Sequence, residues 1–177
     1  MYVYTKLRVM DIHKKLDEDF EGQYVQRKIA YLLLKYGLSI RDEKIHCGPI
    51  EQSNSKLARA ISIDYRVVND TIKKIKKDQE LFDFFSEIEP TPNLKKSASI
   101  AGWGVIEIVP VDPQMPGILH GVSKVLADSD ISIKQAIVED YDLTEDAKLI
   151  IVTQSQIPIN LIDEIKRVKG IRAITLY

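Results

Sequence analysis

Cysteine is nearly absent from this sequence, which has the single Cys47 in 177 residues. One cysteine cannot close an internal disulfide, so we expect a protein that works in the reducing cytoplasm. No apolar run approaches the roughly 18 residues of a membrane span. Residues 1–6 also lack the apolar core of a secretion signal. We therefore expect neither a disulfide framework nor a membrane partner.

The sequence also lacks the parts of a catalytic site. It has no nucleophile beside a base, no glycine-rich phosphate loop and no metal-ligand spacing. His13, His46 and His120 are scattered along the chain. His46 and Cys47 are adjacent and would face opposite sides of a strand. The sequence therefore predicts no enzyme, no cofactor and no metal site.

Charge is distributed unevenly, although the net charge is only −1. Residues 54–77 contain seven basic and two acidic residues, a local charge of +5. From residue 101 onward there are eleven acidic and seven basic residues, a local charge of −4. A basic segment joined to an acidic one indicates two tasks on one chain.

The first 50 residues predict two helices and a small hairpin. We expect a charged opening helix within 5–19. An amphipathic helix follows, which Gly37 ends. Its core-facing positions are Val25, Ile29, Leu32, Leu33 and Tyr36. Extended pieces at 38–40 and 44–47 indicate the hairpin, and Gly48-Pro49 is expected to end it.

Residues 54–73 have the spacing of two short helices joined by a tight turn. The first helix is expected to bury Leu57, Ala58 and Ile61, and the second Val68, Ile72 and Ile75. Asp64 can cap the second helix, while Ile63 fills the turn as an apolar plug. The segment resembles the helix-turn-helix of DNA-binding proteins, except that Ser62 stands where the turn usually has glycine. A left-handed serine is strained by about 1 kcal/mol, which is tolerable.

A basic face of the second helix is the candidate DNA-binding surface. Tyr65, Arg66 and Asn69 would reach base edges, while lysines further along would contact phosphates. The full candidate set is Ser55, Lys56, Tyr65, Arg66, Asn69, Asp70, Lys73, Lys76 and Lys77. A solvated charged face would show the same pattern, and helix-turn-helix units also bind proteins, so both alternatives stay open.

Domain boundaries follow from a proline-rich stretch. The residues from Leu81 to Phe85 predict the last helix of a domain at 1–88, and 89–100 read as a linker. Residues 101–177 then predict a domain of strands and helices, which makes the chain α+β in class. We expect strands at 103–109, 131–138, 148–154 and 171–176, with helices near 116–129 and 160–169.

The order of these elements is β-α-β-β-α-β, the split arrangement of ferredoxin-like sheets. Two helices would cover one face of such a sheet. The other face needs cover, for which a partner subunit is the simplest source. We therefore expect a homodimer or a larger homo-oligomer.

The stretch 109–119 joins the first strand of the second domain to its first helix. Pro116 suits the first helical position, and Gly117 leaves the backbone bare. The N–H groups at such a helix start have no internal partners, so they can receive a carboxylate. An ordinary strand-to-helix turn would contain the same residues, and this alternative stays open.

This turn, together with Ile131-Ser132-Ile133 and the element order, makes residues 103–177 resemble an ACT domain, the ferredoxin-like module that binds amino acids. The whole chain, a helix-turn-helix followed by ACT, resembles a family of archaeal predicted regulators of amino acid metabolism. The run Trp103-Gly104-Val105-Ile106-Glu107-Ile108 contributes most to that resemblance.

The resemblance implies an effector at the strand-to-helix turn, where two ACT domains meet. It implicates Asp112, Met115, Pro116, Gly117, Ile118, Leu119, Ile131, Ser132 and Ile133. Asp112 lies two residues further from Pro116 than in the family pattern, and Asp130 replaces a small residue before the second strand. Some ACT domains only dimerise, which leaves a purely structural role open.

Two functions fit these observations. The first is an amino-acid-responsive transcription regulator, whose partners are double-stranded DNA, a free amino acid and a second copy. The second is a ligand-sensing or dimerising module that acts on a metabolic enzyme without binding DNA. Salt distinguishes them, because each phosphate contact lowers DNA affinity by roughly 0.9 log units per log unit of salt.

Overall fold

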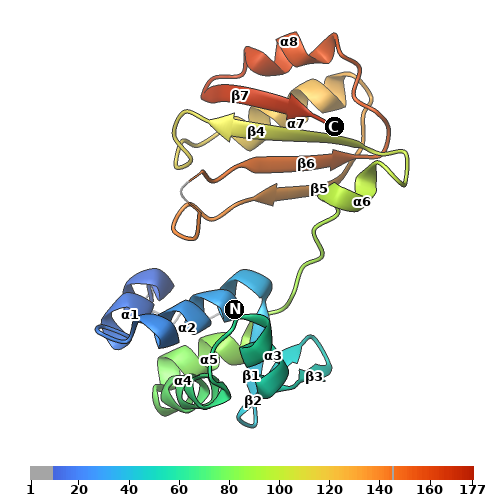
Figure 1. The fold of residues 1–177 in the computed structure, drawn as a ribbon. Coiled ribbons are helices and arrows are strands. Elements are labelled where there is room, and N and C mark those ends of the chain that lie inside the picture. The colour runs from blue at the N-terminus through green and yellow to red at the C-terminus, as the bar shows by residue number, and fades with distance from the viewer. Residues whose placement is uncertain (1–9, 145) are drawn as a thin grey trace, which may run out of the picture. The chain divides into compact units, whose positions relative to one another are not determined.

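The computed structural model describes residues 10–144 and 146–177. The chain divides into two compact units between Thr91 and Pro92 (Figure 1). Both units combine helices with an antiparallel sheet. Among the described residues, no helix is long and apolar enough to cross a membrane.

From residue 10 onward, the part of the N-terminal unit that the structure describes, two helices precede the small sheet and three follow it. The opening helix starts at Ile12, capped by Asp11, whereas residues 5–9 of its expected span lie outside the described residues. The elements are α1 (Ile12–Asp19), α2 (Tyr24–Tyr36), β1 (Leu38–Arg41), β2 (Lys44–Cys47), β3 (Ile50–Gln52), α3 (Asn54–Ala60), α4 (Tyr65–Lys77) and α5 (Gln79–Glu87).

Helix α2 ends as expected at Gly37, which adopts the left-handed conformation. Its buried stripe is narrower than the sequence predicted. Ile29, Ala30 and Leu33 are fully buried, whereas Val25 is 41% exposed and Tyr36 is 60% exposed. The correction has a simple geometric reason: only the middle of the helix packs on the core, and the apolar residues near its two ends extend past it.

The predicted hairpin is a three-stranded sheet in the order β1-β2-β3. Gly48 and Pro49 do not end the structure; they turn the chain back so that Ile50 pairs with Cys47. The third strand is short and contains two polar residues, so its sequence gives little strand signal.

The helix-turn-helix forms as predicted from its local signals. Ser62 adopts the left-handed conformation with φ 56°, and the Ile63 N–H donates to the Ala58 carbonyl at 2.9 Å. The Asp64 carboxylate caps α4 by accepting from the Arg66 N–H at 2.8 Å. The apolar side of α4 is buried at Val68, Thr71, Ile72 and Ile75.

The C-terminal unit has a four-stranded antiparallel sheet in the order β5-β6-β4-β7 (Figure 1). The strand and helix order after residue 103 is the one that the sequence predicted. The elements are α6 (Lys95–Ala98), β4 (Gly104–Pro110), α7 (Ile118–Asp128), β5 (Ile133–Val138), β6 (Leu149–Thr153), α8 (Leu161–Lys166) and β7 (Ile171–Leu176).

The two faces of this sheet are covered differently. Helices α7 and α8 pack on one face, over a core that includes Ile106, Ile108 and Ile151. The short helix α6 packs on the opposite face, which we call the second face, where Ala98 meets Val105, Ile150 and Val152. A segment read as linker therefore covers this part of the face, and the homo-oligomer expected to cover it stays a prediction.

Candidate functional site

Helix α4 presents a polar face to solvent and its apolar face to the core. The exposed residues of the candidate DNA-binding set on this helix are Tyr65, Arg66, Asp70, Lys73, Lys76 and Lys77. The large Tyr65 side chain, at the start of the helix, is 52% exposed. A rigid, capped helix with a mostly basic outer face can enter the major groove of DNA.

Arg66 lies at the exposed start of α4 but is not free of partners. Its guanidinium lies 3.2 Å from the carboxylate of Asp64, the residue that caps the helix. The Arg66 N–H and side chain hold the pKa of Asp64 below its usual value. The guanidinium has five N–H donors, so it can keep this carboxylate as a partner and still donate to a base edge.

Asn69 is held inside the helix-turn-helix. Its side-chain oxygen accepts from the Asn54 side chain at 2.9 Å, which joins α4 to α3. The sequence placed Asn69 beside the bases, whereas the structure engages it in the contact between the two helices. The remaining candidates on α3, Ser55 and Lys56, are exposed near its start, where the Ser55 hydroxyl lies 2.8 Å from that of Ser53.

The lysines of α4 differ in their availability. Lys76 pairs with Glu43 in the β1–β2 turn at 3.0 Å. Lys74 donates to Gln23 at 3.0 Å and lies 4.7 Å from the centre of the Phe20 ring. Lys73 and Lys77 are exposed and form no ion pair with any residue that the structure describes, so they are the lysines most available to phosphates.

A cavity of about 210 Å³ lies beside the start of α7, and we call it the α7 cavity. Helix α7 begins at Ile118, two residues later than predicted, and Gly117 caps it with φ 94°. Most of the lining is apolar. The lining residues are Ile108, Pro110, Pro113, Met115, Gly117, Ile118, Leu119, Val138, Glu139, Ala147, Lys148 and Leu149.

A second, open hollow lies between α7 and the start of β5, and we call it the β5 hollow. It contains the expected ligand contacts Ile131, Ser132 and Ile133. Asp130 also lies there, in the left-handed conformation with φ 56° that usually favours glycine. The other lining residues are His120, Ser123, Lys124 and Ala127.

The nine residues implicated in ligand binding are therefore divided within one chain. Four of them line the α7 cavity: Met115, Gly117, Ile118 and Leu119. Three line the β5 hollow, and Asp112 and Pro116 line neither. The Asp112 carboxylate instead accepts from the Gln114 N–H at 2.9 Å and so stabilises the turn before α7. Within one chain the two groups therefore border different hollows.

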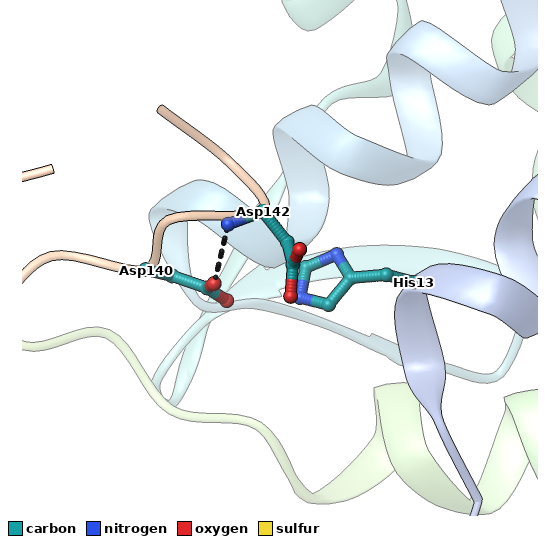
Figure 2. A group of neighbouring side chains, drawn as sticks. All are labelled: His13, Asp140 and Asp142. Carbon is teal, nitrogen blue, oxygen red and sulfur yellow. Dashed lines mark hydrogen bonds between the residues drawn. The ribbon is translucent and has the colours of Figure 1, made fainter. Parts of the chain in front are cut away.

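The loop between β5 and β6 borders the α7 cavity at both of its ends. The Glu139 N–H donates to the Lys148 carbonyl at 2.9 Å, and the Lys148 N–H donates to the Glu139 carboxylate at 3.1 Å. Further along this acidic loop, the Asp142 N–H donates to the Asp140 carboxylate at 3.0 Å (Figure 2). The two bonds between Glu139 and Lys148 fix the base of the loop beside the cavity.

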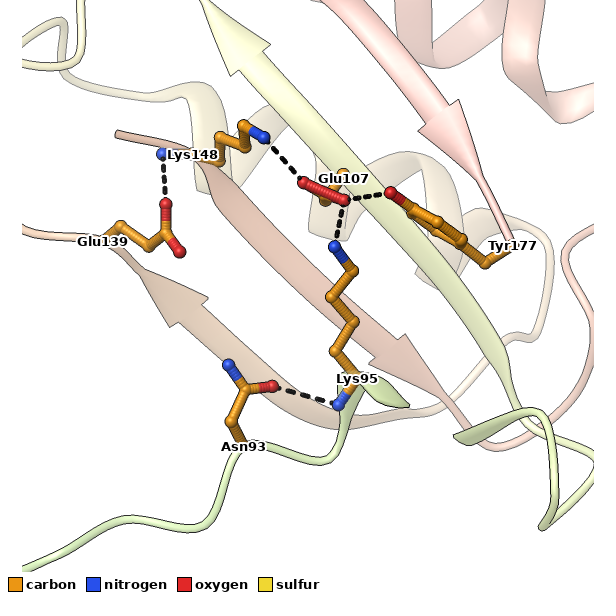
Figure 3. A network of polar contacts seen from close by, with 6 residues as sticks. All are labelled: Asn93, Lys95, Glu107, Glu139, Lys148 and Tyr177. Carbon is orange, nitrogen blue, oxygen red and sulfur yellow. Dashed lines mark hydrogen bonds and ion pairs between the residues drawn. The ribbon is translucent and has the colours of Figure 1, made fainter. Parts of the chain in front are cut away.

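A buried acid on the central strand was not predicted from the sequence. Glu107 on β4 is 4% exposed and accepts from Lys95, from Lys148 at 3.0 Å and from the Tyr177 hydroxyl at 2.5 Å (Figure 3). Burial alone would raise the pKa of Glu107, but the hydrogen bonds outweigh it and lower this pKa to about 2. Glu107 is therefore ionised at neutral pH and lies on the second face of the sheet.

Comparison with protein-family models and with curated proteins gives no match. Among solved structures, the chain is similar to a homoserine dehydrogenase from Thiobacillus denitrificans over 63% of its length, with 18% identity and a TM-score of 0.33. The aligned part spans only 27% of that protein.

Two transcription regulators are also found. The first, an ASNC-family protein from Pyrococcus furiosus, aligns over 86% of both chains with 14% identity and a TM-score of 0.27. E. coli AsnC aligns over 96% of this chain and 90% of its own length, with 11% identity and a TM-score of 0.25. TM-scores this low assign neither a fold nor a function to this chain.

Proposed function

We propose that this chain is an amino-acid-responsive transcription regulator. In this proposal the helix-turn-helix binds double-stranded DNA, while the C-terminal unit is a ferredoxin-like ACT domain that binds a free amino acid and joins two copies. The observation that carries the proposal is the exposed basic face of α4 on a fully formed helix-turn-helix.

In this proposal, different side chains of α4 contact the bases and the phosphates of DNA. Tyr65 and Arg66, which are exposed at the start of the helix, would read base edges, as residues at this position do in other recognition helices. Lys73 and Lys77, further along, would neutralise phosphates and set the strength of binding. In a dimer, two such helices would read half-sites about 34 Å apart.

The α7 cavity is our candidate for the site that binds the side chain of the effector. Its volume of about 210 Å³ is below the roughly 300–1,000 Å³ typical of drug-sized ligands, and its lining is mostly apolar. These properties favour a small amino acid with an apolar side chain. In a dimer, Ile131, Ser132 and Ile133 of the second copy would complete the site. A coupling of roughly 1–3 kcal/mol between sites would change DNA affinity by about 5- to 150-fold.

The salt dependence of DNA binding tests the proposal. We would measure the affinity of the full chain for labelled duplex DNA by fluorescence anisotropy at several salt concentrations. The variant Lys73→Ala/Lys77→Ala should bind DNA more weakly. Its plot of log affinity against log salt should be shallower by about 2, one unit for each lost phosphate contact. Lys169→Ala, which removes an exposed lysine of the C-terminal unit, is the matched control.

Two results would count against DNA binding by this face. One is an equal slope for the wild type and the double variant. The other is DNA binding with little salt dependence, since phosphate contacts release counterions. In either case the alternative, a module that acts on a protein partner, would be preferred.

A further inference from the structure

We propose that residues 92–98 form a strap across the second face of the C-terminal sheet, and that release of this strap transmits ligand binding to the N-terminal unit. The transmission rests on the proposed function. The attachment of the strap to the sheet does not, and it can be tested separately.

The first attachment comes from Gln135 on the edge strand β5. Its side-chain NH₂ donates to the Pro92 carbonyl at 2.6 Å, and its side-chain oxygen accepts from the Leu94 N–H at 2.9 Å. One glutamine therefore satisfies two backbone groups of a segment that has no strand partner. These two bonds fix the strap to β5 at the point where it leaves the N-terminal unit.

The second attachment is the ion pair between Lys95 and Glu107 (Figure 3). The Lys95 ammonium also lies 4.6 Å from the centre of the Tyr177 ring. Because Glu107 belongs to the central strand β4 and is nearly buried, loss of Lys95 would leave an ionised acid with fewer partners. The charge of Glu107 therefore favours the attached state of the strap.

The third attachment is apolar. Ala98 has no exposed surface, and Leu94 and Trp103 pack around it against the second face. The Trp103 N–H donates to the Ala98 carbonyl at 2.9 Å. Only a few apolar side chains take part, so we expect the strap to open at a much lower free energy than the whole domain.

The segment just before the strap, at Glu89 and Pro90, is also packed. A Cβ atom added at Gly37 would lie 2.4 Å from the Glu89 carbonyl oxygen and 2.7 Å from the Pro90 Cα, so the chain there lies directly against α2's end. Thr91 alone separates this contact from Pro92, whose carbonyl is held by Gln135. In our proposal this short connection carries a change in the strap to the N-terminal unit.

The strap is attached to the same elements that border the candidate ligand sites. Strand β5 carries Gln135 and contributes Ile133 to the β5 hollow and Val138 to the α7 cavity. Lys148 borders the α7 cavity, and its side chain holds Glu107 from the second face. A ligand or a second copy that shifts β5 or Lys148 would thus alter the attachments of the strap.

The variant Gln135→Ala tests the attachment. We expect hydrogen exchange of the Leu94 amide in the full chain to become about tenfold faster, because two backbone hydrogen bonds are lost. Trypsin should cleave faster after Lys95 and Lys96. The emission of Trp103, the single tryptophan, should change as its packing loosens. Gln154→Ala, at an exposed glutamine just after β6, is the matched control. Unchanged exchange and cleavage in Gln135→Ala would overturn the attachment.

The transmission is tested with L-leucine, L-isoleucine, L-valine and L-methionine as probes. An amino acid that stabilises the wild type against heat should also change the rate at which trypsin cleaves after Lys96. The variant Gln135→Ala should bind that amino acid with wild-type affinity but lose most of the ligand-dependent change in DNA affinity. A ligand that binds without altering cleavage would overturn the transmission. A wild type that binds none of them overturns the transmission together with the effector part of the proposed function, while the exchange experiment still decides the attachment.

Discussion

The Asn54 side chain donates a 2.9 Å hydrogen bond to Asn69 and so ties the first helix of the helix-turn-helix to the second. Asn69→Ala would leave the half-buried Asn54 amide without this partner. We expect it to lower the free energy of unfolding by about 1 kcal/mol, measured by urea unfolding of the full chain. DNA affinity should fall less than in Arg66→Ala, which removes an exposed side chain at the start of α4.

Asp70→Ala serves as the control for Asn69→Ala, because Asp70 is an exposed neighbour on the same helix. We expect it to change stability by less than about 0.5 kcal/mol. An Asn69→Ala protein of wild-type stability that had lost specific DNA binding would show that Asn69 reads bases, as the sequence first indicated.

The pair between Glu43 and Lys76 predicts a gain of DNA binding. Glu43→Gln removes the carboxylate that holds Lys76 at 3.0 Å and leaves this lysine available to phosphate. We expect non-specific DNA affinity to rise and the log–log salt slope to steepen by up to about 1. Glu51→Gln, which frees Lys44 on the same small sheet, is the matched control. Equal slopes for both variants and the wild type would show that Lys76 does not reach DNA.

Glu107 predicts an acid-sensitive C-terminal unit. The pKa of Glu107 is lowered to about 2 in the folded protein from its ordinary value of 4.5, so its ionised form favours folding. The resulting stability is complete above about pH 4.5 and is lost as the pH falls towards about 2. Thermal unfolding of Glu107→Gln should therefore show a weaker loss of stability over this range. A wild type and variant with parallel pH profiles would contradict this role.

The helix-turn-helix was predictable because its signals are local. Ser62, Ile63 and Asp64 lie within three consecutive positions, and each acts on backbone groups a few residues away. The apolar spacing that buries Val68, Ile72 and Ile75 is a property of α4 alone. For the same reason the strands and helices after residue 103 appeared in the expected order.

The features that the sequence did not reveal depend on contacts between distant residues. Tyr177 and Glu107 are separated by 70 positions, and Gln135 and Pro92 by 43. A glutamate within an apolar strand, or a lysine in a presumed linker, indicates no partner by itself. Likewise, the sequence could place Met115 and Ile131 in one ligand site only through a resemblance, whereas within one chain they border different hollows.

The α7 cavity predicts where amino acid binding can be blocked without disturbing the backbone. Gly117 is a poor target, because any side chain there would be strained at φ 94°. Ala147, which is 4% exposed and lines the cavity, is a better target.

Amino acid binding can be measured by its effect on stability. At 100 times its dissociation constant, an effector should stabilise the wild type by about 2.7 kcal/mol. Ala147→Leu should fill the cavity and remove most of this gain, whereas Ala173→Leu, at an exposed site on β7, should keep it. Full stabilisation of Ala147→Leu would mean that the effector binds elsewhere, and the β5 hollow would then be the site to test, because it holds the remaining implicated residues.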